Sequence, residues 1–308
     1  MKIVFMGTPD FAVAGLEELI NSKHDICAVI TQPDRAKGRG KKYKKTPVKI
    51  CALDNGIPVY QPENINTEDM YVFLENLNAD LFVVIAYGQI LKKRILDMPK
   101  YGAINVHASI LPELRGAAPI NWAIIEGAKF TGITTMQMDI GMDTGDMLLK
   151  RKIEISETTT YGELHDVLME ESRSILLDTI DKIESNSIKL IKQDSEVATY
   201  ARKIDKNLGL IDFNKSAREV SCLIRGLDPK PGAYIIKENI KYKIFEPTVV
   251  KTDLNNKPGE IIRMDKNGLL ISCKEDAICI KIIQAPGKKK MSINAYLLGN
   301  ETWRGTIQ

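Results

Sequence analysis

His107 is the residue whose type and place in the chain point most clearly to chemistry. It ends an apolar run that begins at Ala103, and Asn105 lies two positions before it. Residues two apart in a strand point to the same side, so the amide and the imidazole should face one site at the strand's carboxyl end, where open α/β sheets bind ligands. An imidazole there could transfer a proton or stabilise an oxyanion. An Asn-x-His pair also occurs as a purely structural feature, so the pair alone leaves the function open.

The other potentially reactive side chains form no comparable pattern. His24 follows the first predicted helix, and His165 lies one position off the apolar stripe of a later helix, so we expect both at the surface. The five cysteines are scattered, and none belongs to a C-x-x-C pair. We therefore expect buried thiols, with neither a disulfide framework nor a zinc site.

Residues 138–146, which read Met-Asp-Ile-Gly-Met-Asp-Thr-Gly-Asp, form a second constellation. They follow another apolar run and place three carboxylates and two glycines within nine residues, more than an ordinary turn needs. A calcium loop would need the EF-hand spacing and its terminal glutamate, which are absent, so we expect no metal. A carboxylate from this loop beside His107 would fix the tautomer of the ring and favour its charged form.

Short apolar runs alternate with helical patterns over the first two thirds of the chain. The runs at 2–6 and 81–86 are almost entirely apolar, as expected of strands covered on both faces. The alternation predicts right-handed β-α-β units, and hence an α/β fold with an open, mostly parallel, Rossmann-like sheet. Strands are expected at 2–6, 26–31, 59–60, 81–86, 103–106 and 133–138, and helices at 11–21, 47–54, 68–77, 119–126 and 161–184.

The last hundred residues have a different pattern. Short β-branched runs are separated by turn signals such as Asn267-Gly268 and Pro286-Gly287, and one helix is expected near 216–226. Five short strands with one helix favour a small barrel of the OB type over the alternative of a small open sheet. We therefore predict a catalytic domain over residues 1–186, a linker over 187–208 and an OB-like domain over 209–308.

Length and composition limit the class of protein. The chain has 308 residues, enough for two domains, and is 44% hydrophobic and 27% charged, as is usual for a globular protein with a real core. No apolar run approaches the roughly 20 residues that span a bilayer. The apolar stretch at the N-terminus is too short for a signal peptide. We expect a cytoplasmic monomer without a membrane partner.

The positive charge is concentrated in two places. Residues 209–308 hold 17 Lys and Arg against 11 Asp and Glu, and residues 34–49 hold eight basic side chains against Asp34 alone. This distribution suggests a polyanionic partner reached from both regions. The glycines and charge of residues 35–45 argue against a packed element there, and a solvated charge run without a partner is the alternative. Its place after the second strand, near the sheet's carboxyl edge, favours a nucleic-acid contact.

These motifs together resemble those of the formyltetrahydrofolate-dependent transferases. The resemblance rests on Asn105-x-His107, on Ser109-Ile110-Leu111-Pro112-x-x-Arg115-Gly116 and on the 139–146 loop. With residues 5–11, 32–35 and 38–42 included, the chain is most similar to the members that act on methionyl-tRNA, and the resemblance covers essentially its whole length. Ile110 is a small departure, because leucine is more usual there.

The resemblance implies a reaction and a set of residues. The formyl group of 10-formyltetrahydrofolate would pass to the α-amine of initiator methionyl-tRNA, with Asn105 and a protonated His107 stabilising the oxyanion and Asp143 holding His107 charged. The folate would contact Ser109, Ile110, Leu111, Pro112, Ile85, Tyr87, Gly88 and Asp139. The tRNA would contact Arg35, Lys37, Arg39, Lys41, Lys42, Lys44, Lys45 and Lys206, with Arg39 as the main contact.

Three other classes of protein compete with this interpretation. A dehydrogenase would need G-x-G-x-x-G after the first strand, where this chain has Gly7 followed by Thr8 and Pro9. A formyltransferase for aminosugar nucleotides would share the Asn/His/Asp site, but its chemistry does not require the basic loop. An RNA-binding protein without catalysis would explain the loop and leave the Asn/His/Asp constellation without a role.

Overall fold

The computed structural model describes residues 1–37, 42–253 and 256–307. These fall into two compact units that are each discontinuous in sequence. The first unit comprises Met1–Gly116, Thr131–Ile153 and His165–Ala201, and the second comprises Ala117–Phe130, Glu154–Leu164 and Arg202–Gln308. Within the described residues, no helix has the length and apolar character that crossing a membrane would require.

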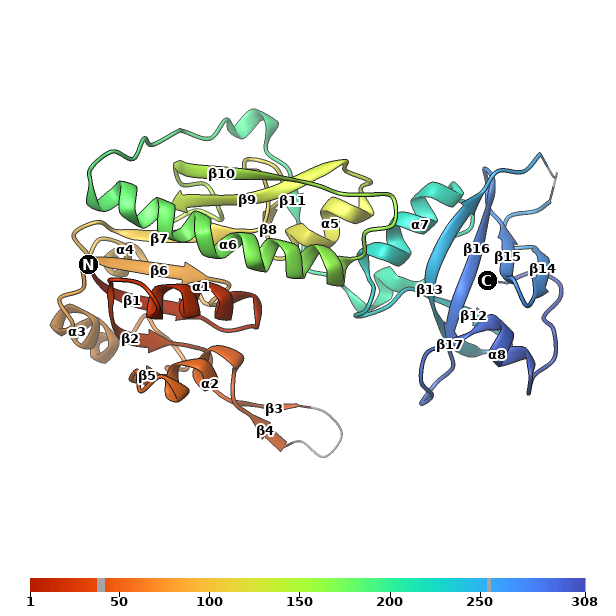
Figure 1. Cartoon of the computed structure of the whole chain (residues 1–308), viewed down its shortest axis with the longest axis horizontal. Coiled ribbons are helices and arrows are strands. Elements are labelled where there is room, and N and C mark those ends of the chain that lie inside the picture. Colours follow the sequence, from red (N-terminus) through yellow and green to blue (C-terminus); the bar gives the residue numbers. More distant parts are fainter. Residues whose placement is uncertain (38–41, 254–255, 308) are drawn as a thin grey trace. The chain divides into compact units, whose positions relative to one another are not determined.

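A seven-stranded sheet forms the centre of the first unit, in the order β10-β9-β7-β6-β1-β2-β5 (Figure 1). Neighbouring strands from β5 through β7 pair in parallel, and β9 joins β7 antiparallel. This confirms the predicted α/β fold with an open, mostly parallel sheet. The strands are β1 (Lys2–Gly7), β2 (Asp25–Ile30), β5 (Val59–Tyr60), β6 (Leu81–Ile85), β7 (Ala103–His107), β9 (Phe130–Gln137) and β10 (Met147–Glu154).

Helices cover both faces of this sheet because its strands are apolar on both sides. Val4 and Met6 pack into a core with α3 and α4, whereas Phe5 faces α1. Gly15 lets α1 approach closely: a Cβ there would lie 2.6 Å from Ile85 Cδ1 and 3.3 Å from Leu176 Cδ2 on α6. The helices are α1 (Phe11–Ile20), α2 (Pro47–Asp54), α3 (Glu68–Asn76), α4 (Lys93–Leu96) and α6 (Tyr161–Glu184).

Two histidines differ from the sequence expectation. His24 is buried, with its Nδ1 atom 3.2 Å from the amino group of Met1, and burial together with that positive charge lowers the pKa of His24. The His165 side chain is only 12% exposed and lies 2.9 Å from Asp166. The prediction of surface positions was wrong for both, because periodicity within a helix does not show which other elements cover its ends.

The second unit contains an antiparallel half-barrel in the order β12-β13-β16-β15-β14, with β17 paired to β16. It encloses an apolar core with α7, whose first turn is fixed by a capping box between Ser216 and Glu219. This confirms the predicted small barrel domain. The elements are β12 (Tyr234–Lys237), β13 (Ile240–Val250), β14 (Ile261–Asp265), β15 (Gly268–Ser272), β16 (Ala277–Gln284), β17 (Met291–Ser292), α7 (Ala217–Gly226) and α8 (Ile293–Leu297).

The helix α5 (Pro119–Ile125) belongs to this second unit although it follows the strand that carries His107. The Asn121 amide donates a 2.7 Å hydrogen bond to the carbonyl of Gly226 on α7. A Cβ on Gly226 would lie 2.5 Å from Ile125, so glycine is required for this close packing. The second unit therefore includes residues far upstream of the half-barrel.

Candidate active site

The strand β7 places Asn105 and His107 on the same side of the sheet. Its neighbours fix the register: Val84 pairs with Asn105 on one side, and Thr134 pairs with His107 on the other. The His107 side chain is only 6% exposed, whereas Asn105 is half-buried. Among the described residues, the Asn105 amide has no hydrogen-bond partner. The site thus holds one amide whose donors are uncommitted.

The two nitrogens of the His107 ring have different surroundings. The Nε2 atom lies 3.0 Å from the Leu114 carbonyl oxygen, which can only accept, so Nε2 carries a proton. The Nδ1 atom lies 3.7 Å from Asp143 Oδ2, an ion-pair distance that is too long for a hydrogen bond. The same Oδ2 atom accepts a 2.7 Å hydrogen bond from the backbone N–H of Gly116. The structure therefore brings the predicted carboxylate within ion-pair distance of the imidazole, and the predicted amide lies on the same side of the same strand.

The loop that carries Asp143 is folded tightly by its own residues. Asp143 has a φ of +55°, in the left-handed region, and the Asp139 carboxylate accepts from Gly141 N at 3.0 Å and Thr144 Oγ1 at 2.7 Å. A Cβ on Gly145 would clash with the Gln137 carbonyl oxygen, so only glycine fits there. Asp139, predicted at the folate site, contributes its carboxylate to the loop itself.

A buried arginine and a glutamine brace this loop. Arg115 is 2% exposed and donates from Nε and Nη2 to Gln193 Oε1, at 3.0 and 2.8 Å. Gln193 Nε2 donates in turn to the carbonyls of Asp143 and Gly145, both at 2.8 Å. The sequence analysis missed Gln193, which lies in the stretch predicted as linker. Arg115 was the signal that could have led to it, because an arginine that becomes buried needs a polar partner from elsewhere in the chain.

The predicted folate segment 109–112 divides into internal and accessible residues. Ser109 and Leu111 are fully buried: Ser109 Oγ donates to Glu113 O at 2.6 Å, and Leu111 packs with Met136 and Met147. Lys150 Nζ donates to the Leu111 carbonyl at 2.6 Å, and the Leu111–Pro112 bond is cis. Burial lowers the pKa of Lys150. Ile110 and Pro112 are half-buried, so these two have side-chain surface to offer a ligand.

The end of β6 shows a similar division. Ile85 and Tyr87 are buried in the core, and burial raises the pKa of Tyr87, whose hydroxyl has no partner among the described residues. Ala86 and Gly88 are exposed, with φ values of +46° and +90°. The predicted contacts at Ile85, Tyr87 and Gly88 would thus come from the backbone around Ala86 and Gly88 rather than from the large side chains.

The basic segment is more ordered at its base than the sequence suggested. Antiparallel pairing joins β3 (Arg35–Lys37) to β4 (Lys42–Lys44), a short regular element that the sequence analysis did not predict. Two strands outside the glycines can pair even though the glycines themselves disfavour structure. The predicted contacts Arg39 and Lys41 lie outside the described residues, as do the side chains of Lys37, Lys42 and Lys206.

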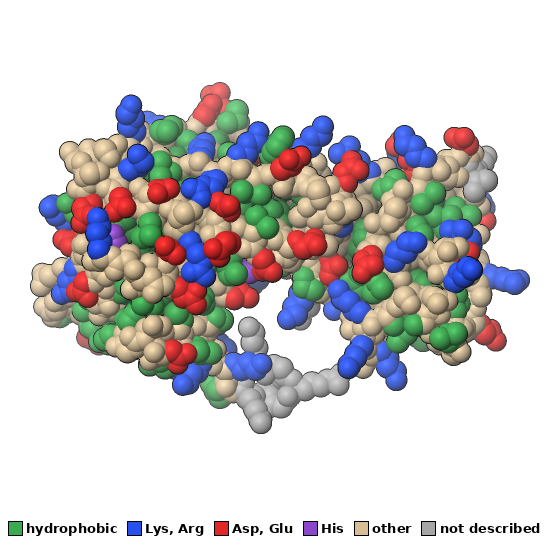
Figure 2. Space-filling view, in the orientation of Figure 1, with side chains coloured by type: hydrophobic (Ala, Val, Ile, Leu, Met, Phe, Trp, Pro, Cys, Tyr) green, Lys and Arg blue, Asp and Glu red, His purple; other side chains and the backbone are tan. Residues whose placement is uncertain are grey.

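The cations of this segment differ in their partners. Lys49 Nζ lies 2.7 Å from Asp34 Oδ2 and also contacts Gln61, so it is committed to the hairpin base, and this contact lowers the pKa of Asp34. Arg35 pairs with Glu63 at 2.7 Å on the surface. Lys44 and Lys45 are exposed. Elsewhere on the first unit, Figure 2 shows acidic and basic side chains interspersed on the face that carries α6, where Arg173 pairs with Glu17 at 2.7 Å.

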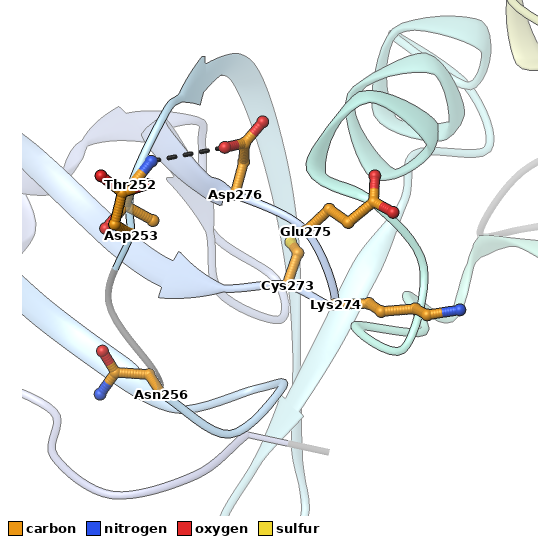
Figure 3. Close-up of a pocket in the computed structure, with 7 residues that line it drawn as sticks. All are labelled: Thr252, Asp253, Asn256, Cys273, Lys274, Glu275 and Asp276. Carbon is orange, nitrogen blue, oxygen red and sulfur yellow. Dashed lines mark hydrogen bonds between the residues drawn. The ribbon is translucent and has the colours of Figure 1, made fainter.

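A separate surface pocket of about 510 Å³ opens on the second unit (Figure 3). It is lined by Thr252, Asp253 and Asn256 on one side and by residues 273–276 on the other, and Asp276 accepts from Thr252 N at 3.4 Å. Burial raises the pKa of the Cys273 thiol to about 12, so it is not a nucleophile near neutral pH. The pocket contains none of the predicted site residues.

Comparison with known proteins agrees with the geometry at His107. Residues 1–180 match the family described as formyl transferase, and residues 203–301 match the formyl transferase C-terminal domain. The methionyl-tRNA formyltransferase of Alkaliphilus oremlandii (strain OhILAs) is 50% identical over 307 residues, which cover 100% of this chain and 99% of that protein. The methionyl-tRNA formyltransferase of Acetivibrio thermocellus is 46% identical over 308 residues, with the same coverage of both chains.

Solved structures show the same fold at lower identity. WlaRD, a sugar 3N-formyl transferase, aligns with a TM-score of 0.68 at 24% identity over 94% of this chain and 99% of its own. An N-formyltransferase from Helicobacter canadensis aligns with a TM-score of 0.64 at 20% identity, over 91% and 98%. These relatives are 46–50% identical to this chain and match its whole length, so the chain belongs to the formyl transferase family, among the methionyl-tRNA formyltransferases.

Proposed function

We propose that this protein transfers the formyl group of 10-formyltetrahydrofolate to the α-amino group of initiator methionyl-tRNA, giving N-formylmethionyl-tRNA for translation initiation. The observation that carries the proposal is the convergence of Asn105, His107 and Asp143, with Asp143 Oδ2 3.7 Å from His107 Nδ1. The full-length similarity to methionyl-tRNA formyltransferases supports the choice of acceptor. The reaction would take place where aminoacyl-tRNA is made, in the cytoplasm, with the enzyme acting as a monomer.

In the proposed reaction, the amine attacks the formyl carbon and a new C–N bond forms while the carbonyl oxygen becomes an oxyanion. Asn105 Nδ2 and His107 Nδ1 are the donors for that oxygen, because Nε2 is engaged by the Leu114 carbonyl. Asp143 Oδ2 lies beside Nδ1, and with Nε2 protonated the ring donates from Nδ1 in its doubly protonated form. When the oxyanion collapses, the bond to the folate nitrogen breaks, and the proton shed by the amine passes through Asp143 to that nitrogen.

The residues around this site suit a reduced folate. A flat heterocycle needs apolar surface on its faces and backbone groups at its edge. Ile110 and Pro112 offer half-buried apolar surface, and Ile140 and Met142 of the Asp143 loop are 75% and 64% exposed. The backbone around Ala86 and Gly88 is exposed at the end of β6. We assign the folate to these segments, with Ser109, Leu111 and Asp139 shaping them from within.

The tRNA would be held by the β3/β4 hairpin and by the basic C-terminal region. Lys44 and Lys45 are exposed, and Arg35 is paired only at the surface, where an ion pair is readily exchanged for a phosphate. Arg39 remains the predicted main contact, together with Lys37, Lys41, Lys42 and Lys206. By family resemblance, the loop would enter the acceptor-stem end of an initiator tRNA and sense its weak first base pair.

The experiment that tests the function supplies 10-formyltetrahydrofolate labelled in the formyl carbon together with methionyl-tRNA and an aminosugar nucleotide in one mixture. We expect label on the methionyl-tRNA and none above background on the sugar. Label on the sugar alone would support the alternative acceptor, an aminosugar nucleotide, and contradict the proposal. Unacylated tRNA serves as the control, since it lacks the α-amine and should remain unlabelled.

A further inference from the structure

The carboxamide of Gln193 uses all of its hydrogen-bonding capacity around the proposed catalytic loop. Its oxygen accepts from Nε and Nη2 of Arg115, and its nitrogen donates to the carbonyls of Asp143 and Gly145. A guanidinium can only donate and a carbonyl can only accept, so the amide fits in one orientation only. Asp143 itself is held from a segment fifty residues further along the chain.

Asp143 needs such a support because its backbone conformation is unfavourable by itself. A φ of +55° is unfavourable for a non-glycine residue and persists only where the surroundings impose it. The two hydrogen bonds from Gln193 Nε2 hold the carbonyls of residues 143 and 145 on either side of Thr144. This fixes the peptide planes that set the direction of the Asp143 side chain toward His107.

The segment that follows Gln193 supports the other partner of His107. Thr199 Oγ1 accepts from Leu114 N at 2.8 Å, and Thr199 O accepts from Arg115 N at 2.9 Å. Beyond it, β11 (Tyr200–Ala201) pairs in parallel with β8 (Arg115–Gly116). Leu114 supplies the carbonyl that engages His107 Nε2, and Gly116 supplies the N–H that engages Asp143. Residues 193–201 therefore contact the backbone on both sides of the His107–Asp143 pair.

We infer that Gln193 is a positioning residue for formyl transfer, acting through the backbone of Asp143. The inference rests on the function proposed above, because it gives Asp143 a role in the reaction. The competing explanation is that Gln193 only supplies a partner to the buried Arg115 guanidinium. Both explanations require the Arg115 contact, but only the first requires the two hydrogen bonds donated to the loop.

Gln193→Glu separates the two explanations. The carboxylate keeps an acceptor for Arg115 but replaces both donors with an oxygen that faces two carbonyl oxygens. We expect kcat to fall roughly 10- to 100-fold, with KM for methionyl-tRNA and for the folate within about twofold, because a small displacement of a reacting group costs rate rather than binding. Gln193→Met, which removes every hydrogen bond at similar size, should lower both kcat and Tm.

Ser195→Ala is the matched control. Ser195 Oγ accepts a 3.5 Å hydrogen bond from Arg115 Nη2, and among the described residues it has no hydrogen bond to the Asp143 loop, so its removal takes a partner from the arginine and no bond from the loop. We expect kcat within about twofold of the wild-type value for this variant. A loss in Ser195→Ala as large as that in Gln193→Glu would overturn the inference in favour of the Arg115 explanation.

The decisive readout repeats Gln193→Glu in an Asp143→Asn background. If Gln193 acts through Asp143, the double variant should have a kcat less than about twofold below that of Asp143→Asn alone, because the effects of residues that act as a unit are not additive. If Gln193→Glu lowered kcat by the same factor in both backgrounds, or left kcat unchanged in the wild-type background, the inference would be overturned. The proposed function would still stand in either case, provided that Asp143→Asn impairs turnover. Wild-type turnover by Asp143→Asn would instead overturn the proposed function, and with it the inference.

Discussion

At the scale of single residues, the proposed chemistry depends on side chains that are only partly committed to the fold. The His107 ring uses one nitrogen to hold the Leu114 carbonyl and leaves the other beside Asp143. Asn105 is half-buried, and its amide has no hydrogen-bond partner in the described part of the chain. A structural asparagine in a strand would be expected to satisfy its amide within the protein. These uncommitted donors are what a developing oxyanion needs.

Asn105→Ala should therefore impair catalysis without impairing the fold. We expect kcat to fall roughly 100- to 1000-fold, as when one donor is removed from an oxyanion site, with Tm within about 2 °C of the wild type. Steady-state formylation and thermal unfolding measure the two quantities. Asn121→Ala is the opposite control: it breaks a buried bond to Gly226, so it should cost about 1–3 kcal/mol of stability and leave kcat near wild type.

Some residues of the site could be predicted from the sequence and others could not. Asn105, His107 and Asp143 stand next to apolar strands, and strand geometry alone brings such residues to one edge of a sheet. Gln193 and Thr199 are separated by 78 and 85 positions from the residues that they contact, Arg115 and Leu114, and no local pattern encodes such a pairing. Likewise, an expected ligand contact at Ser109 or Leu111 cannot be distinguished from an internal one without knowing their burial.

At the scale of elements, the acidic loop acts as a rigid support whose shape depends on glycine. Gly145→Ala would force a Cβ against the Gln137 carbonyl and displace the loop that carries Asp143. We expect kcat to fall about 100-fold, since misplacement by about an ångström has that effect. Gly299→Ala is the control, because a Cβ there meets nothing within 4 Å, and it should leave kcat and Tm unchanged. Equal kcat in the two variants would contradict this account of the loop.

The base of the β3/β4 hairpin is a second element with a testable support. Asp34 is paired with Lys49 and Gln61, and its pKa is lowered mainly by Lys49. A carboxyl whose folded pKa is depressed stabilises the fold above its unfolded pKa of about 3.9, and this stabilisation is lost as the pH falls through the folded value. Asp34→Asn should cost about 1 kcal/mol at pH 7 and progressively less below pH 4. Urea unfolding at several pH values measures this, and a cost independent of pH would contradict it.

The elements themselves were largely predictable, with exceptions that have physical reasons. All-apolar runs such as residues 81–85 and the 3.6-residue period of α6 predicted their elements with nearly correct bounds. The strand β10 was missed because its apolar start gives way to Lys150-Arg151-Lys152 and Glu154, which resemble a solvated segment. The β3/β4 pairing was missed because its strands are short and basic, and only their partner makes them strands.

At the scale of the whole molecule, the charge distribution predicts how binding depends on salt. The basic side chains of residues 34–49 and 209–308 exceed the acidic ones, although the net charge of the chain is only +3. Replacing both Lys44 and Lys45 with alanine should weaken tRNA binding and reduce the slope of log K against log salt by about 1 to 2. The kcat at saturating tRNA should remain within about threefold of the wild type, because neither residue belongs to the formyl site.

The control for this prediction is Lys23→Ala. Lys23 is also an exposed lysine, but it is committed to Asp181 and Glu184, at 3.0 and 2.8 Å. Removing it should leave both the affinity for tRNA and the salt slope unchanged, although it also removes positive charge, one unit against the two of the Lys44 and Lys45 variant. If Lys23→Ala lowered the tRNA affinity and the salt slope as the Lys44 and Lys45 variant does, net charge rather than the hairpin would govern the affinity.

The central claim is that His107 and Asp143 work together on the formyl group, and a double-mutant cycle tests it most directly. Single-turnover formylation of methionyl-tRNA would be measured for His107→Ala, Asp143→Asn and the double variant, with tRNA affinity measured alongside. We expect the rate of His107→Ala to fall about 1000-fold or more while tRNA binding is retained. The rate of the double variant should lie within about threefold of the rate of His107→Ala. Rates near wild type for His107→Ala, or losses that simply multiply in the double variant, would contradict the account.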